Sequence, residues 1–265
     1  MSHRGRAGET GNGVLRQDAG VVRSVLPPEQ RVAAVARLRR AVARALDRDA
    51  VLCRGETVLV ACSGGPDSTA MLDALARLAP PRRLRLAVAH VDHRLRAGSE
   101  SEAHLVAEHA LRYGLPFTAL DVTVPSGGSL QDRARRERHA ALRGLAERLD
   151  ATAIALGHTA DDQAETVLMR ALRGATPRSL LAMGQRDGLL ARPLLRVWRQ
   201  AVLDYCAALG LRTADDPSNS DPRFLRARVR HEVIPVLEAV FPAARRRLVA
   251  LAEAERRVHG AAADH

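Results

Sequence analysis

The sequence predicts an α/β fold with a parallel sheet, and three observations support that prediction. Segments rich in Val, Leu, Ile and Ala alternate with segments whose apolar residues recur at helical spacing. A glycine-rich turn, residues 63–68, joins the first of these strands to a helix. Polar residues gather directly after three of the strands. Alternating strands and helices form βαβ units around a buried parallel sheet, and ligands bind such sheets at the carboxyl ends of the strands.

The elements follow one another in a regular order. Residues 1–27 are rich in Gly, Arg and Ser and have no periodicity, which predicts a disordered basic arm. A helix follows over 28–49, because Val32, Val35 and Leu38 begin a run of apolar residues at helical spacing. The predicted strands are 57–62, 84–91, 117–122 and 152–157. The predicted helices between and after them are 67–79, 99–113, 130–149 and 160–173.

The C-terminal part of the chain is predicted to be helical. One helix spans about 197–209, and a polar loop then leads into a basic segment, residues 223–231. Arg223, Arg226 and Arg230 share a helical face there, which suits either a polyanion or the acidic loop before it, and both interpretations stay open. A last helix runs from Pro242 to about Val258. We therefore predict one domain over 28–218 and a helical extension over 219–265.

Composition limits the classes of function. The formal net charge is +11 at pH 7, and all 41 basic residues are arginine, which indicates a polyanionic partner. Aromatic residues make up only 2% of the chain, which argues against base-stacking surfaces. Three scattered cysteines argue against zinc ribbons, iron–sulfur ligation and disulfides. No membrane-spanning stretch or signal core is recognisable, so a cytoplasmic protein is expected.

The turn after the first strand is a candidate phosphate site. Its sequence is Ser63-Gly64-Gly65-Pro66-Asp67-Ser68. Adjacent glycines let the backbone approach an anion, the serines add hydroxyl groups, and the new helix presents free N–H groups. Ordinary P-loops end in Gly-Lys-[Ser/Thr], which a chain without lysine cannot supply, so this site is of another type. The alternative is a plain tight turn with Asp67 as helix N-cap.

A second group of polar residues follows the fourth strand. It runs from Gly157 to Thr166, and a helix that begins near Thr159 places Asp162 and Glu165 on one face. Carboxylates beside a phosphate loop hold Mg²⁺ together with substrate phosphates, so Asp67 and Asp162 are the metal candidates. The alternative is that these carboxylates only complement the helix dipole.

Other polar residues favour structural interpretations. His90 and His93 follow the second strand, and each is more easily explained as structural than as catalytic. On the helix 130–149, we expect Arg133, Arg136 and Arg143 to form a solvated face.

Three motifs in this order resemble the N-type ATP pyrophosphatase, or PP-loop, superfamily and, within it, the tRNA(Ile)-lysidine synthetases. They are residues 63–68, residues 157–166, and Asp216-Pro217-Ser218-Asn219 followed by spaced arginines. Residues 90–96 with Ser99, and Ala134-Arg135 with Arg138, resemble further family motifs. The resemblance covers roughly residues 30–240.

The resemblance implies an adenine nucleotide alpha hydrolase-like domain that binds ATP with Mg²⁺. Such an enzyme adenylates C2 of the wobble cytidine of a CAU-anticodon tRNA(Ile), and the amine of free lysine then displaces AMP and leaves lysidine. By motif position, the ATP phosphates would be held by Ser63, Gly64, Gly65, Pro66, Asp67 and Ser68. The reacting centre would contain His158, Asp161, Asp162, Arg135 and Arg138, with Asp162 as the essential carboxylate. On charge alone, Asp161, Glu165 and the pair Asp215-Asp216 are candidates for the ammonium groups of lysine.

The sequence departs from the family pattern in places. Ala227 follows Arg226 where the family usually has Asn, and His139 stands where an aromatic residue is common. Many members also carry C-terminal domains, so we expect a short form or a fragment here. Two alternatives remain: a related tRNA thiolation, against which the scattered cysteines argue, and a non-catalytic basic RNA-binding protein, against which the intact motifs argue. The oligomeric state is left open, a homodimer included.

Overall fold

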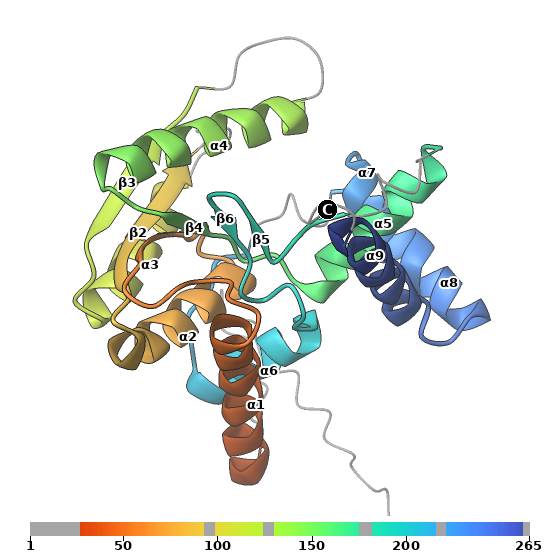
Figure 1. The fold of residues 1–265 in the computed structure, drawn as a ribbon, viewed down its shortest axis with the longest axis horizontal. Helices are drawn as coiled ribbons and strands as arrows, with labels where there is room; N and C mark the ends of the chain where they lie inside the picture. The colour runs from red at the N-terminus through yellow and green to blue at the C-terminus, as the bar shows by residue number, and fades with distance from the viewer. Residues whose placement is uncertain (1–26, 93–98, 124–129, 175–181, 216–220, 262–265) are drawn as a thin grey trace, which may run out of the picture.

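The fold is a parallel α/β sheet with an attached group of helices (Figure 1). The computed structural model describes residues 27–92, 99–123, 130–174, 182–215 and 221–261. Its six strands lie in the order β3-β2-β1-β4-β6-β5, and every neighbouring pair is parallel except β5 with β6. The strands are β1 Thr57–Ala61, β2 Arg85–Asp92, β3 Phe117–Asp121, β4 Ala153–Ala155, β5 Arg186–Asp187 and β6 Leu190–Ala191. The predicted fold class is confirmed.

The helices match the predicted pattern closely. They are α1 Pro28–Asp47, α2 Pro66–Arg82, α3 Ser99–Arg112, α4 Leu130–Arg148, α5 Ala160–Leu172, α6 Arg199–Leu209, α7 Leu225–Arg228, α8 Ile234–Val240 and α9 Ala244–Ala261. A π-helical turn, η3 Val229–Val233, joins α7 to α8, so the basic segment 223–231 is not one regular helix. The predicted arm 1–27 lies outside the described residues except for Pro27.

The central strands β1 and β4 are buried on both faces because they are apolar at nearly every position. Along β1, Val58 and Val60 face a core shared with α1, α2, α3 and α6, whereas Leu59 faces a second core under α4. Strand residues alternate between the faces of a sheet, so a continuous apolar run is what two covered faces require. Figure 1 shows α4 on one side of the sheet and α1 and α2 on the other.

A buried carboxylate joins α1, α2 and α6, which cover the same face of the sheet. Asp73 of α2 is 2% exposed and accepts hydrogen bonds from the hydroxyls of Tyr113 and Tyr205. It also accepts hydrogen bonds from Nε of Arg77 at 3.1 and 3.2 Å, and lies 3.6 Å from the guanidinium of Arg39 on α1. Burial alone raises the pKa of Asp73, but these hydrogen bonds outweigh it and hold the pKa below its ordinary value. The network therefore fixes α1 and α6 relative to α2.

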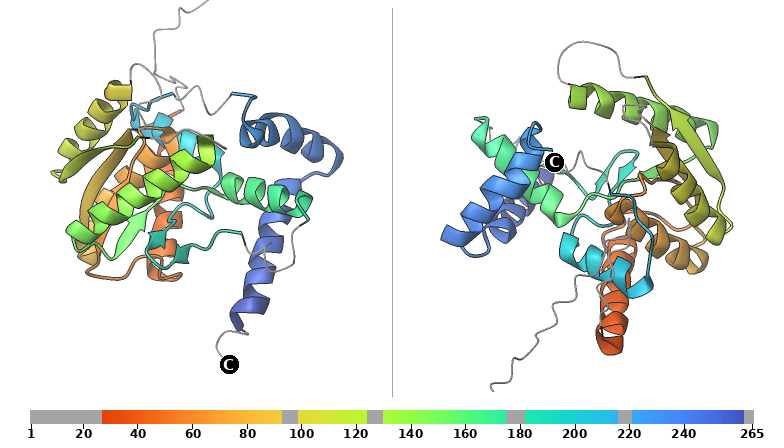
Figure 2. Two further views of the ribbon diagram at one scale, coloured as in Figure 1. Left: turned by 90° about the horizontal axis from the view of Figure 1, so that it is seen from above. Right: turned by 180° about the vertical axis from the view of Figure 1, so that it is seen from behind.

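The C-terminal helices form a smaller unit around α5. Figure 2 shows α5 leading away from the sheet into this unit. Its small core contains Leu168 of α5, Val229 of η3 and Ile234 of α8. Among the described residues, no helix is both long and apolar enough to span a bilayer.

Two boundaries differ from the prediction for physical reasons. Helix α2 continues through Pro80 and Pro81 to Arg82, three residues beyond the expected end. Prolines cost least where few helical hydrogen bonds remain to be lost, and here they lie in the last turns. The hairpin of β5 and β6 was not predicted, because two-residue strands are too short to produce a recognisable period.

Candidate active site

The glycine loop links β1 to α2 and has a backbone that only glycine adopts easily. Gly64 has φ +85°, and a Cβ there would meet Cβ of Ala214 at 3.4 Å. Its carbonyl accepts hydrogen bonds from N–H of Ala214 at 2.8 Å and from the hydroxyl of Thr69 at 3.0 Å. Gly65 is the N-cap of α2 and Pro66 its first residue, and no side chain caps the helix. The N-terminus of α2 is therefore open to an anion.

The two serines of the loop have different environments. Ser68 is 7% exposed; its hydroxyl donates to the carbonyl of Gly65 at 3.1 Å and accepts from N–H of Ser63 at 3.1 Å. Ser68 thus holds the loop in shape. Ser63 is exposed, and its hydroxyl lies 3.2 Å from that of Ser68. The outer hydroxyl of the loop is that of Ser63.

The loop after β4 packs directly onto the start of α2. A Cβ on Gly157 would lie 3.0 Å from the backbone N of Ser68 and 3.2 Å from the carbonyl carbon of Asp67. Only a glycine permits this approach without movement of the backbone. Strands β1 and β4 are parallel neighbours on the side of β1 opposite to β2, which is the switch point where α/β sheets bind ligands. The two predicted motifs therefore meet at one edge of the sheet.

Asp67 has one oxygen paired and one oxygen without a partner. Oδ2 accepts a hydrogen bond from the guanidinium of Arg199 on α6 at 2.8 Å, whereas Oδ1 is buried and has no hydrogen-bond donor among the described residues. Burial raises the pKa of Asp67 to about 6; Arg199 opposes the shift, and Asp162 and Asp161 add to it. Asp67 is not the N-cap, because that position belongs to Gly65.

Asp162 is engaged on both oxygens. Oδ2 accepts hydrogen bonds from N–H of Thr159 at 2.8 Å and from its hydroxyl at 2.9 Å, which completes a capping box at the start of α5. Oδ1 accepts from Arg226 at 3.0 Å and Arg230 at 3.1 Å. Burial alone raises the pKa of Asp162, but Arg226, His158 and these other contacts hold it below the ordinary value. Asp162 therefore does stabilise the start of α5, as the alternative interpretation predicted, and it also binds two arginines.

Glu165 lies one turn further along α5 and is paired with the same two arginines. Its side chain is 1% exposed and accepts hydrogen bonds from Nε of Arg226 at 2.7 Å and Nε of Arg230 at 2.6 Å. The basic segment therefore pairs with α5, whereas Arg223 pairs with Asp221. The spacing of Arg226 and Arg230 by four residues was the available signal, but nothing in the sequence identified α5 as their partner.

Asp161 connects three helices. Oδ2 accepts a hydrogen bond from N–H of Arg199, the first residue of α6, at 2.7 Å. Oδ1 accepts from the guanidinium of Arg245 on α9 at 2.8 Å. Both oxygens therefore have structural partners. Arg199 was not singled out from the sequence, where no local pattern distinguishes it.

His158 lies between the carboxylates and a group of arginines. Its Nδ1 is buried and has no hydrogen-bond partner among the described residues. Burial lowers the pKa of His158 to about 3, with Asp162 opposing this shift and Arg192, Arg135 and Arg226 reinforcing it. The imidazole is therefore neutral at pH 7. His90, in contrast, makes a 3.0 Å hydrogen bond to the carbonyl of Cys62 and is structural, whereas His93 lies outside the described residues.

The arginines of α4 complete a positive region. Burial lowers the pKa of Arg138, and Arg135 and Arg226 lower it further, so these guanidinium groups lie within electrostatic reach of one another. Arg136 and Arg143 are exposed, as predicted. The interpretation of Arg133 as solvated is wrong, because its Nε and one terminal nitrogen are buried with no hydrogen-bond acceptor among the described residues. A buried guanidinium of this kind suits an anion.

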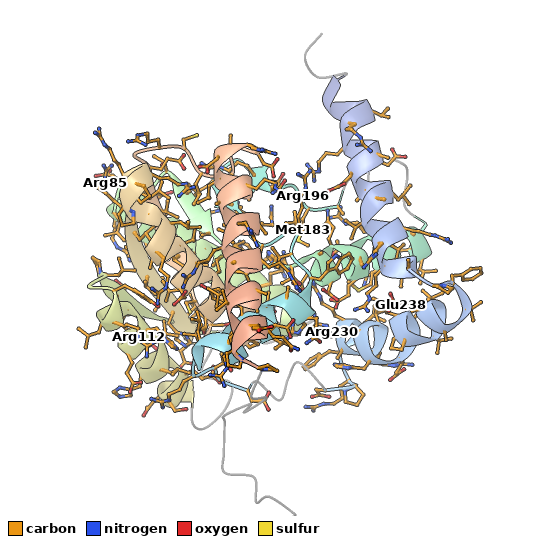
Figure 3. All side chains as sticks on the ribbon, turned by 90° about the horizontal axis from the view of Figure 1, so that it is seen from below. Arg85, Arg112, Met183, Arg196, Arg230 and Glu238 are labelled. Carbon is orange, nitrogen blue, oxygen red and sulfur yellow. The ribbon has the colours of Figure 1, made fainter. Side chains whose placement is uncertain are left out.

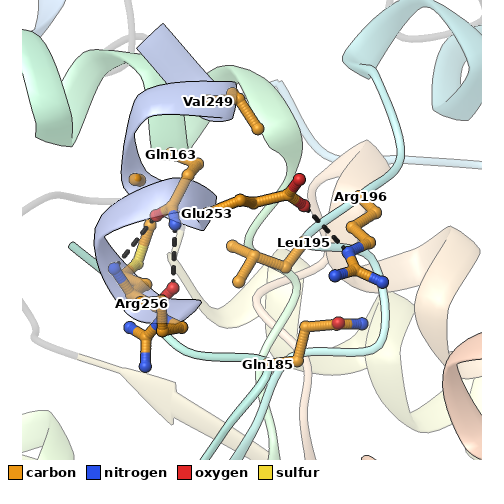
Figure 4. A pocket seen from close by; sticks show the side chains of 9 residues that line it. Gln163, Gln185, Leu195, Arg196, Val249, Glu253 and Arg256 are labelled. Carbon is orange, nitrogen blue, oxygen red and sulfur yellow. Dashed lines mark hydrogen bonds and ion pairs between the residues drawn. The ribbon is translucent and has the colours of Figure 1, made fainter. Parts of the chain in front are cut away.

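A small cavity of about 60 Å³ lies beside the site, between α5, α9 and the segments that precede and follow the β5–β6 hairpin (Figure 4). Gln163 of α5 forms one wall of the cavity. Its side-chain amide donates to the carbonyl of Met183 at 2.8 Å and accepts from N–H of Met183 at 3.0 Å. Arg196 and Glu253 form an ion pair at 3.0 Å on the other side. At this volume the cavity is too small for a nucleotide.

A metal would have few ligands from the described side chains. In these ranges, no group of three or more His, Cys, Asp or Glu residues is arranged to hold a metal ion. The free Oδ1 of Asp67 suits Mg²⁺, which needs only one or two carboxylates when substrate phosphates supply other ligands. Asp162 becomes a ligand only if it releases an arginine. Asp215 is exposed, and residues 216–220 with the Asp-Pro-Ser-Asn motif lie outside the described residues.

Comparisons with known proteins agree with this geometry. Residues 36–237 match the PP-loop domain family. The tRNA(Ile)-lysidine synthase of Thermobifida fusca is 48% identical over 207 residues, covering 78% of this chain and 63% of that protein. The enzyme of the same name from Salinispora arenicola is 46% identical over 209 residues, covering 77% and 62%. The chain thus spans a little under two thirds of these relatives.

Among solved structures, a U34-tRNA thiolase from Methanococcus maripaludis, determined with its [4Fe-4S] cluster, has a similar fold. Its TM-score is 0.69 with 19% identity, and the match covers 84% of this chain and 79% of the thiolase. At that identity the likeness concerns the fold.

Proposed function

Because the chain belongs to the PP-loop domain family, we propose that it binds ATP and joins free lysine to the wobble cytidine of a CAU-anticodon tRNA(Ile). The products are lysidine, AMP and pyrophosphate. The relatives named tRNA(Ile)-lysidine synthase support this choice of reaction. The observation that carries the proposal is the contact of Gly157 with the start of α2, since it brings the phosphate loop and the acidic start of α5 to one edge of the sheet.

In this proposal the open N-terminus of α2 receives the ATP phosphates. The backbone of residues 63–68, the Ser63 hydroxyl and the free N–H groups of the first turn are the donors. Mg²⁺, when bound, neutralises phosphate charge, with Oδ1 of Asp67 as its protein ligand. We assign residues 28–218 to this ATP-binding domain and residues 219–265 to a helical extension.

The reaction requires two displacements. The C2 oxygen of cytidine attacks the α-phosphorus and expels pyrophosphate; the lysine amine then attacks C2, loses a proton and expels AMP. The chain acts by positioning and by electrostatic stabilisation. Arg135 and Arg138 stabilise the phosphate charge, and the neutral imidazole of His158 hydrogen-bonds the reacting groups. Asp162 orients the arginines that close the site.

The ammonium groups of lysine require carboxylates, and the candidates have different availability. Glu165 and Asp161 are both occupied by arginines, so an ammonium would replace a guanidinium at either residue. Asp215 is exposed and forms no ion pair with another described residue, so it can receive one without such an exchange. We propose a cytoplasmic enzyme, and a homodimer remains a prediction.

The test is incubation of the protein with ATP, labelled lysine and total tRNA. Incorporation of label that requires all three, into a CAU-anticodon tRNA(Ile), supports the proposal. No incorporation, with AMP formation also missing, contradicts it and favours a non-catalytic RNA-binding protein. ATP-dependent incorporation of sulfur instead of lysine favours thiolation, although Cys62 and Cys206 are buried and only Cys53 is exposed.

A further inference from the structure

Helix α1 carries a row of exposed arginines on the face turned away from the core. Arg37, Arg40, Arg44 and the C-cap residue Arg48 follow one another at intervals of three or four residues, and all four are exposed. At about 100° per residue they fall within an arc of about 80°, and at about 1.5 Å per residue they extend over about 17 Å. We call these four residues the arginine ridge. Buried residues of α1, such as Leu38, Val42 and Leu46, occupy another face.

The charge of the ridge is not compensated within the described part of the chain. None of its four guanidinium groups forms an ion pair with a described carboxylate, and Arg40 donates only to the carbonyl of Ala36 in its own helix. Arg39, which lies between them in sequence, turns inward to Tyr205 and Asp73. Asp47 is turned to Arg82 of α2, with contacts of 2.6 and 2.8 Å. The helix therefore directs its carboxylate away from the ridge and leaves the arginines facing solvent.

The ridge runs alongside the helix that begins at the candidate site. Arg39 of α1 contacts Asp73 in the middle of α2, and Asp47 at the end of α1 contacts Arg82 at the end of α2, so the two helices run parallel. The ridge consequently extends from the level of the middle of α2 toward its end, at the edge of the sheet opposite the site. Figure 3 shows α1 beside α2, with α6 next to it on the other side. A polyanion that reaches the site can continue along α1.

We propose that the arginine ridge binds the phosphate backbone of the RNA stem adjoining the loop that enters the active site. This inference rests on the proposed function. Guanidinium groups are bidentate phosphate donors, and successive turns of a helix present them about 6 Å apart. Such contacts position a nucleic acid without reading its sequence. The near absence of aromatic residues in the chain also fits binding through phosphates rather than stacked bases.

The experiment compares two triple variants by their affinity for a CAU-anticodon tRNA(Ile) transcript as a function of salt. The ridge variant is R37Q/R40Q/R44Q. The control is R83Q/R85Q/R148Q, which removes the same charge from exposed arginines after α2, at the start of β2 and at the end of α4, on the edge opposite the site. Glutamine keeps helix propensity nearly unchanged, and thermal unfolding verifies that both variants fold.

The ridge variant should bind tRNA at least about tenfold more weakly at low salt, with the slope of log K against log salt reduced by about 3. The control should reproduce the wild type. Equal affinity and slope for the ridge variant and the control overturn the inference, because the ridge is then only a solvated face. Lysidine formation by the wild-type protein tests the proposed function separately, so the failure of the ridge and the failure of the proposed function give different results.

Discussion

The substitution Gly157→Ala tests whether the close packing of β4 against α2 determines the site. The new Cβ would lie 3.0 Å from N of Ser68, 3.1 Å from its Cα and 3.2 Å from the carbonyl carbon of Asp67. These atoms belong to the backbone, so a side-chain rotation cannot relieve the contact. An ordinary contact begins at 3.4 Å, so the two backbones must separate by about 0.4 Å.

The separation should affect both stability and catalysis. Overpacking of this kind typically lowers the free energy of unfolding by about 1–3 kcal/mol. Because a displacement of about 1 Å at a catalytic site costs about 100-fold, a shift of about 0.4 Å should slow tRNA- and lysine-dependent pyrophosphate release by roughly tenfold. Urea unfolding and a pyrophosphate assay measure the two effects.

Gly144→Ala is the matched control. Gly144 lies inside α4, where a Cβ would meet only the Arg148 guanidinium at an ordinary 3.7 Å. This variant should be stabilised by about 1 kcal/mol, because alanine is the better helix former, and should keep its activity. If Gly157→Ala has wild-type stability and activity, the contact does not hold the two loops in position and does not determine the candidate site.

Three further outcomes are expected. Asp162→Asn should reduce AMP formation at least about 100-fold while tRNA binding stays nearly intact, measured by AMP release and by filter binding; AMP release at the wild-type rate contradicts the assigned role. Asp73→Asn should cost about 3 kcal/mol at pH 7 in urea unfolding. Since the pKa of Asp73 is lowered in the folded protein, its contribution to the free energy of unfolding is complete above the unfolded pKa and is lost as pH falls through the folded pKa. The wild type should therefore lose more stability in acid than the variant. Parallel curves of stability against pH for the two proteins refute this expectation. The His158 ring, with a pKa lowered to about 3, should show flat NMR shifts from pH 5 to 8, and a midpoint near its ordinary 6.5 contradicts its burial.

The sequence predicted the parts of the site that are local in the chain. The loop around Gly64 and the helix start at Thr159 each depend on neighbours a few residues away, so their patterns are recognisable. The four consecutive residues Thr159–Asp162 even place Asp162 at the third helical position of a capping box.

The parts of the candidate site that the sequence did not predict depend on contacts between residues far apart in the chain. Arg199 lies 132 residues from Asp67, and Arg226 lies 61 from Glu165. Local periodicity carries no information about such pairs, and formal charge alone did not show that Glu165 would be neutralised by the basic segment. For the same reason Arg133 seemed solvated, although the fold buries part of its guanidinium.

The pairing of α5 with the basic segment also has a consequence for synthesis of the protein on the ribosome. Glu165 and Asp162 emerge 61 to 68 residues before the arginines that neutralise them. At about 5–20 residues per second, this delay amounts to roughly 3–14 s. During that interval strands β1–β4 and the phosphate loop are already made, whereas two carboxylates that will be buried still require water. The nascent chain must therefore keep the start of α5 hydrated, and the edge of the sheet that holds the candidate site closes only when the last quarter of the chain arrives.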